Sequence, residues 1–201
     1  MKKGLLYVHG KGGSAQEAEH YKPLFPEYDV VGLDYHSRTP WEARGEFRRF
    51  FDSFAAPHDD IILIANSMGA FFAMHALNDK PIAKAYFISP IVDMEALIAG
   101  MMARAGVTEG ELREKGAIET AFGETLSWDY LSWVRAHPVS WGAPTSILCG
   151  AKDNLQSTET IRAFAAQIGA DITVMENGEH WFHTEEQTAF LDGWLRRVQI
   201  G

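Results

Sequence analysis

Ser67 has the local sequence of a nucleophile. It lies between two apolar runs, residues 61–64 and 70–77, which predict a strand, a sharp turn and a helix. Such a turn holds the serine at positive φ, presents its Oγ beyond the sheet and needs small residues two positions away, here Ala65 and Gly69. The alternative interpretation is a buried strand and helix with an incidental serine.

Partners for a serine nucleophile follow at the ends of two later strand candidates. Asp153 follows the apolar run 145–149, and His180 follows the run 171–175. A neutral imidazole can take the serine proton, and a carboxylate on its other nitrogen fixes the tautomer. Asp93, after the run 84–88, is a second candidate for the acid.

A glycine-rich loop after the first strand candidate predicts donors for an oxyanion. Residues 4–8 run into His9 and Gly10, so the backbone N–H groups of Lys11 and Met68 are the expected donors. A phosphate-binding loop is the competing interpretation. No Gly-Lys-Ser/Thr follows at Walker spacing, and the glycines at 10, 12 and 13 do not fit Gly-x-Gly-x-x-Gly.

Taken together, these motifs resemble the α/β-hydrolase fold superfamily over essentially the whole chain, in the manner of a small serine esterase. The resemblance implies a catalytic triad and an oxyanion hole, with these roles: Ser67 as nucleophile, Asp153 as acid, His180 as base, and Lys11 and Met68 as oxyanion donors. Ala65 occupies the position of the first glycine in the family's Gly-x-Ser-x-Gly motif around the nucleophile. The family's N-terminal antiparallel strands are missing, because the His-Gly loop begins at residue 9. A reduced, mostly parallel sheet is therefore expected.

The alternation of apolar runs and helical patterns predicts an α/β fold with a doubly wound, six-stranded sheet. The expected strands lie near 4–8, 29–33, 60–65, 84–88, 145–149 and 171–175. Thr39, Thr108 and Thr184 each precede a Glu or Gln by three residues and are expected to begin helices. The last of these helices has one apolar face, consisting of Phe190, Leu191, Trp194, Leu195 and Val198.

Residues 90–141 depart from this alternation, with helical patterns and no convincing strand. The resemblance implies a helical cap, inserted before the fifth strand of a single domain spanning 1–201, which acts as a lid over Ser67. Five residues are candidates for the substrate pocket: Met94, Met101, Trp128, Trp133 and Trp181. The same spacing also fits ordinary helix packing. If these residues line the pocket, one part of the substrate is apolar and small to medium in size.

Composition excludes several classes of function. A net charge of −9 argues against partners that need basic patches, namely nucleic acid and anionic membranes. Cys149 is the single cysteine, which excludes an intrachain disulfide and a thiolate zinc cluster. Because it lies in a strand candidate, it is expected to be a core residue. His183 follows His180 without a matching carboxylate, so no metal and no cofactor are expected. No apolar run is long enough to span a bilayer, and a cytoplasmic protein is expected.

These patterns predict a serine hydrolase that cleaves a carboxylic ester or thioester through an acyl-enzyme intermediate. Amide bonds, carbon–carbon bonds and acyl transfer to another acceptor remain alternatives, because they use the same triad. A catalytically silent member that binds a small ligand, and a partner-binding scaffold, are alternatives from other classes. Asn66 and Glu179, which flank Ser67 and His180, are expected to be structural. The sequence does not indicate an oligomeric state.

Overall fold

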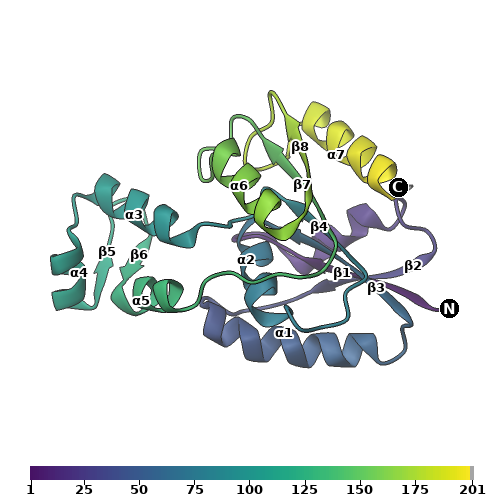
Figure 1. The fold of residues 1–201 in the computed structure, drawn as a ribbon, viewed down its shortest axis with the longest axis horizontal. Coiled ribbons are helices and arrows are strands. Elements are labelled where there is room, and N and C mark those ends of the chain that lie inside the picture. Colours follow the sequence, from purple (N-terminus) through teal and green to yellow (C-terminus); the bar gives the residue numbers. More distant parts are fainter. Residues whose placement is uncertain (200–201) are drawn as a thin grey trace. The chain divides into compact units, whose positions relative to one another are not determined.

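A six-stranded parallel sheet organises the chain in the computed structural model, which describes residues 1–199 (Figure 1). The strand order is β2-β1-β3-β4-β7-β8, and each neighbouring pair is parallel. The six strands are β1 Lys3–Val8, β2 Tyr28–Leu33, β3 Asp60–Asn66, β4 Lys84–Ile88, β7 Thr145–Gly150 and β8 Asp171–Met175. All six predicted strands are confirmed, each to within one residue at either end.

Helices cover both faces of this sheet. The 3₁₀ helix η1 (Ala15–Tyr21) and the last helix, α7 (Glu185–Val198), pack on one face, where side chains from alternate strand positions form a buried cluster. That cluster includes Leu5, Tyr7, Ile62, Ile64, Tyr86, Ile88, Leu148, Leu191, Trp194 and Leu195. The predicted apolar face of the last helix is therefore confirmed. The fold is the expected doubly wound α/β arrangement.

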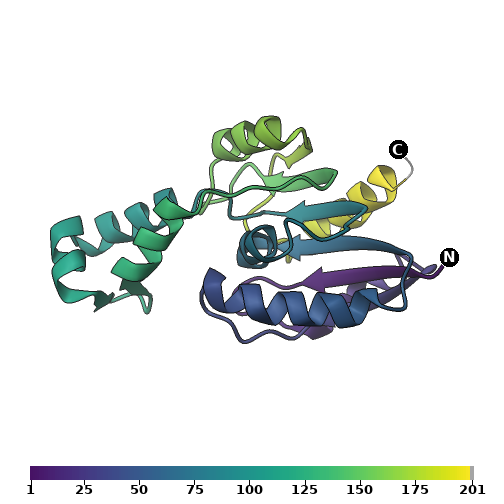
Figure 2. The ribbon, with the colours of Figure 1, turned by 60° about the horizontal axis from the view of Figure 1, so that its bottom comes forward.

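The remaining helices of this part are α1 (Pro40–Ala55), α2 (Ser67–Ala76) and α6 (Thr158–Ile168). Helices α1 and α2 pack against each other, and Figure 2 shows α1 lying along the sheet. Across the sheet, the chain moves in one direction from β1 to β2 and in the opposite direction from β2 to β3 and from β3 to β4. Because connections between parallel strands are right-handed, α1 and α2 lie on the face opposite η1.

The predicted helix starts follow from side-chain caps. Thr39 accepts a hydrogen bond from the Glu42 N–H (3.4 Å) at the start of α1, and Thr184 accepts one from the Gln187 N–H (3.2 Å) at the start of α7. In α1, the Glu42 carboxylate accepts a hydrogen bond from the Thr39 N–H (3.1 Å), which completes a capping box. Both helices begin where the sequence predicts.

Residues 93–139 form a second compact unit, within the predicted insert 90–141. It contains α3 (Met94–Ala105), α4 (Glu109–Lys115), β5 (Ala117–Glu119), β6 (Thr125–Ser127) and α5 (Trp128–Ala136). Ile98, Met102, Leu112, Leu126 and Leu131 are buried. Thr108 caps α4 through a capping box, as its sequence predicts. The Arg135 guanidinium ties α5 to Glu95 (2.7 Å) in α3 and to Glu109 (2.9 Å) in α4.

The expectation of an insert without strands is wrong. β5 and β6 form an antiparallel hairpin whose turn contains Gly123 at φ 84°. Each strand has only three residues, and Leu126 is the one buried side chain among them, so the apolar pattern is too short to mark a strand in the sequence.

No helix within residues 1–199 combines the length and the apolar character that crossing a membrane requires.

Candidate active site

The turn between β3 and α2 holds Ser67 in a strained conformation. Its φ of 48° lies in the left-handed region that a serine rarely adopts. The Ile91 N–H donates to the Ser67 carbonyl (3.2 Å) from the segment after β4. Gly69 is required because a Cβ there would lie 2.2 Å from the His9 carbonyl oxygen. The turn at Ser67 is therefore held by contacts with the segments that follow both neighbouring strands, β1 and β4.

Three side chains from three different strand ends form one hydrogen-bonded chain. The Ser67 Oγ lies 2.7 Å from the His180 Nε2, and the His180 Nδ1 lies 2.7 Å from the Asp153 Oδ2. The Asp153 side chain is 1% exposed, whereas that of His180 is 16% exposed. The carboxylate is thus shielded from water, and the imidazole reaches the cavity. This is the arrangement that proton transfer from a serine requires.

Backbone donors fix the buried carboxylate. The Asp153 Oδ1 accepts hydrogen bonds from the N–H groups of Leu155 (2.8 Å) and Gln156 (3.1 Å), which leaves Oδ2 for the imidazole. Asp93, the alternative acid, instead caps α3, where its carboxylate accepts a hydrogen bond from the Ala96 N–H (2.8 Å). The contact to His180 is made by Asp153.

Two contacts hold the loop that carries His180. A Cβ on Gly150 would lie 2.2 Å from the Gly178 carbonyl oxygen, so the loops after β7 and β8 approach too closely for any other residue. Gln187, which is buried in α7, donates to Glu179 (3.5 Å) and accepts from the His183 N–H (3.2 Å). Glu179 is therefore structural, as expected. The role of Gln187 was not predicted, because a lone glutamine in a helix carries no sequence signal.

The loop after β1 lies directly beside Ser67. A Cβ on Gly10 would lie 3.2 Å from the Ser67 Cβ. Tyr35 supports this loop, because its ring stacks on His9 (centroids 4.3 Å apart) and its hydroxyl donates to the His9 carbonyl (2.9 Å). Lys11 lines the cavity next to Ser67. The Met68 N–H is in the first turn of α2, where such groups have no acceptor within the helix.

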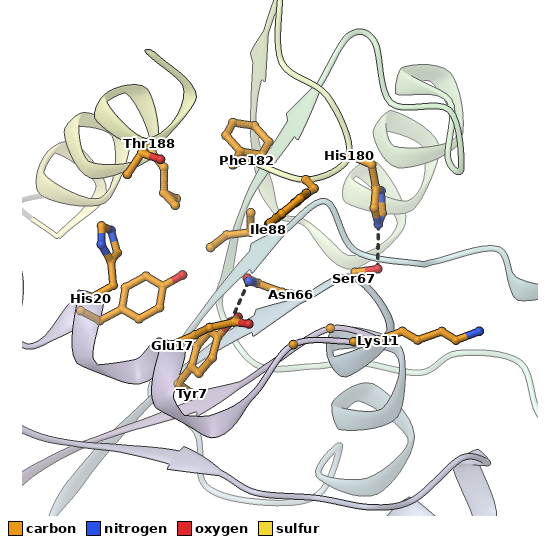
Figure 3. A pocket seen from close by; sticks show the side chains of 16 residues that line it. Tyr7, Lys11, Glu17, His20, Asn66, Ser67, Ile88, His180, Phe182 and Thr188 are labelled. Atoms are coloured by element: carbon orange, nitrogen blue, oxygen red, sulfur yellow. Dashed lines mark hydrogen bonds between the residues drawn. The ribbon is translucent and has the colours of Figure 1, made fainter. Parts of the chain in front are cut away.

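A cavity of about 530 Å³ opens beside Ser67 and His180 (Figure 3). Its apolar lining includes Ile88, Trp181, Phe182 and Leu191, and its polar lining includes Tyr7, Glu17, His20, Tyr21, Asn66 and Thr188. This lining is therefore mixed in character, with both apolar and polar side chains.

Trp181 is the one predicted pocket residue that lines this cavity, and it is 73% exposed. The other four, Met94, Met101, Trp128 and Trp133, belong to the second unit, so their place in a substrate pocket stays a prediction. Within that unit, the Arg113 guanidinium lies over the Trp128 ring, 4.6 Å from the ring centroid. The Trp133 ring stacks on the His137 ring.

A polar network that the sequence did not predict lines the cavity. The Asn66 Nδ2 donates to the Tyr7 hydroxyl (2.9 Å), and the Tyr7 hydroxyl donates to the Glu17 carboxylate. The Tyr7 ring is fully buried, and this burial raises the pKa of its hydroxyl far above the ordinary range, so the hydroxyl stays protonated. Asn66, expected to be structural, thus contacts the cavity. The sequence carries one signal for Glu17, which is its position three residues after Ser14, the spacing of a capping box.

Within residues 1–199, no group of three or more His, Cys, Asp or Glu side chains is arranged to hold a metal ion. The His183 Nδ1 instead contacts the Trp181 carbonyl oxygen (2.7 Å), and its ring stacks on that of Trp181.

Comparison with known proteins agrees with this fold. A family model described as "Alpha/beta hydrolase family" matches residues 5–192. A protein of Mycoplasma genitalium named "Putative esterase/lipase 3" is 32% identical over 76 residues, which are 36% of this chain and 27% of that protein. The match thus spans about a quarter of the length of this relative.

Two solved structures illustrate the likeness of the fold. Est1E from Butyrivibrio proteoclasticus has a TM-score of 0.76 at 15% identity, over 99% of this chain and 87% of that one. Alpha/beta hydrolase domain-containing protein 10 from mouse has a TM-score of 0.77 at 16% identity, over 98% of this chain and 89% of that one.

Proposed function

The chain belongs to the α/β-hydrolase family, and on this premise we propose that it is a serine hydrolase that cleaves a small to medium carboxylic ester or thioester through an acyl-enzyme intermediate. The observation that carries the proposal is the hydrogen-bonded chain Ser67–His180–Asp153, with 2.7 Å at each contact. The esterase-like relative supports ester hydrolysis as the activity.

In the first half-reaction, the Ser67 Oγ attacks the carbonyl carbon of the substrate while the His180 Nε2 takes the hydroxyl proton. The Asp153 carboxylate holds the imidazole through Nδ1 and stabilises the imidazolium that forms. The Lys11 and Met68 N–H groups are the proposed donors to the oxyanion. The intermediate then collapses, the carbon–oxygen or carbon–sulfur bond breaks, and His180 returns the proton to the leaving group.

In the second half-reaction, a water molecule attacks the acyl-enzyme as His180 takes one of its protons. Collapse of the second tetrahedral intermediate releases the carboxylic acid and restores the Ser67 hydroxyl. The reaction needs no group beyond these side chains, backbone donors and water.

The cavity supports the proposed size of the substrate. A volume of about 530 Å³ accommodates a small to medium acyl or alcohol group. Ile88, Phe182 and Leu191 offer apolar contacts to its hydrocarbon part. The inserted unit 93–139 remains the proposed cap, in the role of a lid that excludes water during the reaction.

A panel of p-nitrophenyl esters of increasing acyl length tests the proposal. Wild-type protein is expected to release p-nitrophenol, with a maximum of kcat/KM at short or medium chains. The variant Ser67→Ala is expected to lower turnover by on the order of a thousandfold or more. Turnover that persists in a clean Ser67→Ala preparation would place the reaction elsewhere, and no turnover of any ester by the wild type would favour a ligand-binding protein.

The role of Asp153 is tested by a matched pair of variants. Asp153→Asn is expected to lower kcat by at least about a hundredfold, because the amide no longer selects the imidazole tautomer that accepts the serine proton. Asp93→Asn is the control, since asparagine caps a helix as well as aspartate does. Loss of activity in Asp93→Asn with retention in Asp153→Asn would reverse the assignment.

A further inference from the structure

We propose that the cavity beside Ser67 selects substrates that carry a protonated amine, with the Glu17 carboxylate as the group that binds it. The inference rests on the proposed function, because it names the class of ester that the serine hydrolase would take. It is carried by the position of Glu17, by the charges around it and by the apolar side chains that line the same cavity.

The Glu17 carboxylate is held in place before any ligand binds. Its Oε1 accepts a hydrogen bond from the Ser14 N–H (3.0 Å), and its Oε2 accepts one from the Tyr7 hydroxyl. A Cβ on Gly13 would lie 2.5 Å from Oε1, so the loop has no side chain where the carboxylate approaches it. Each oxygen keeps a second lone pair for a ligand. A preorganised acceptor binds without the entropy cost of ordering a free side chain.

No positive side chain neutralises Glu17. Within residues 1–199 it has no salt bridge. Figure 3 shows the Lys11 side chain extending away from Glu17. His20, which also lines the cavity, is paired with Asp192 (2.8 Å), and His180 is paired with Asp153. Glu17 therefore presents a negative charge to this side of the cavity.

The route from Glu17 to the nucleophile is short and partly apolar. Glu17 is joined through the Tyr7 hydroxyl to Asn66, the residue before Ser67. Ile88, Phe182 and Leu191 line the same cavity. A hydrocarbon chain whose carbonyl is at Ser67 can therefore lie on these side chains with its far end at Glu17.

An ammonium group fits this end better than a neutral or anionic one. A carboxylate only accepts hydrogen bonds, and a bond from a charged donor is about twice as strong as one from a neutral donor. An anion at the same place would be repelled, and the net charge of −9 adds to that repulsion.

Two p-nitrophenyl esters of equal length provide the test, the 6-aminohexanoate and the heptanoate. They differ only in whether the chain ends in an ammonium or a methyl group. Wild-type protein is expected to show a higher kcat/KM for the amino ester, and Glu17→Gln is expected to lower the ratio of the two kcat/KM values about fivefold. Glu42→Gln is the matched control, since it removes a carboxylate from another capping box, outside the cavity lining.

Binding measurements separate this inference from the proposed function. n-Hexylamine is expected to bind the wild type more tightly than 1-hexanol by calorimetric titration, and Glu17→Gln is expected to abolish the difference. If neither ester is hydrolysed while this difference holds, the proposed function fails and the amine site stands. If both esters are hydrolysed with a ratio that Glu17→Gln leaves unchanged, the amine site is overturned and the hydrolase stands.

The wild type alone gives a further readout that does not depend on the folding of a variant. Raising NaCl from about 0.05 M to about 0.5 M shortens the screening length severalfold and is expected to reduce the preference for the amino ester. A preference that is absent at low salt, or one that salt does not change, contradicts an ionic contact with Glu17.

Discussion

Ser67 and Ser89 are the two non-glycine residues at positive φ within residues 1–199, at 48° and 42°. Both follow directly from neighbouring strands, β3 and β4, at the edge of the sheet where the active-site loops gather. Strain at Ser67 places the hydroxyl within 2.7 Å of the His180 imidazole. The backbone conformation of Ser67 thus sets the position of its side chain.

Cys149 gives a prediction at the same scale. Its thiol is buried in β7, and burial, together with the nearby Asp153 carboxylate, raises the pKa of the thiol to about 11. Native protein at neutral pH is therefore expected to react very slowly with a thiol reagent such as dithionitrobenzoate, and to react fully after unfolding in guanidinium. Rapid stoichiometric labelling of the native protein would contradict a core role for this residue.

Residues with roles set by a motif were predictable, and residues with roles set by tertiary contact were not. Ser67, Asp153 and His180 each follow an apolar run, so parallel strands bring them to one edge. Tyr7 meets Asn66 across 59 residues of sequence, and only the pairing of β1 with β3 brings them together.

At the scale of elements, Gly69 fixes how closely α2 approaches β1. A Cβ there would lie 2.2 Å from the His9 carbonyl oxygen, a backbone atom that cannot turn aside. Gly69→Ala is expected to lower the free energy of unfolding by about 3 kcal/mol, measured by urea denaturation, and to lower esterase activity.

Gly45 is the control for that substitution. It lies inside α1, and a Cβ there would meet no atom within 4 Å. Gly45→Ala is expected to raise the free energy of unfolding by roughly 0.5–1 kcal/mol, since alanine is the better helix former. Equal effects of the two substitutions would show that the approach of α2 to β1 does not constrain position 69.

Helix α1 is also joined to the segment that follows α2 by an ion pair whose effect depends on pH. The Arg48 guanidinium contacts both oxygens of Asp79 (2.6 and 2.8 Å) and donates to the Ala76 carbonyl at the end of α2 (3.0 Å). These hydrogen bonds lower the pKa of Asp79 from 3.8 to about 2. A carboxyl with a lower pKa in the folded state stabilises the fold above its unfolded pKa, and this stabilisation is lost as the pH falls through the folded pKa.

We therefore expect stability to decline between about pH 4 and pH 2, with a smaller decline in Asp79→Asn. Thermal unfolding across this range measures the difference. Arg48→Gln should flatten the profile in the same way, because it removes the partner. Identical pH profiles for wild type and both variants would mean that this exposed pair contributes nothing.

The elements of the sheet were more predictable than those of the insert. The central strands β1, β3, β4 and β7 are buried apolar runs, and capping residues mark the starts of α1, α4 and α7. The β5–β6 hairpin has three-residue strands with one buried side chain, Leu126, and its position depends on the turn at Gly123 and on packing within residues 93–139.

At the scale of the molecule, an acidic protein is expected to discriminate among thioesters by charge. The net charge of −9 repels polyanionic substrates over distances set by the salt concentration. We expect a lower kcat/KM for a coenzyme A thioester than for the N-acetylcysteamine thioester of the same acyl group, with a smaller difference at high salt. A preference for the coenzyme A thioester would contradict the account of a negatively charged site.

Labelling with a fluorophosphonate tests whether Ser67 is a nucleophile that His180 activates. Intact-mass analysis is expected to show a single adduct, mapped by peptide analysis to Ser67, that is absent in Ser67→Ala and forms far more slowly in His180→Ala. An unlabelled wild type with intact esterase activity, or an adduct on another residue, would contradict the account.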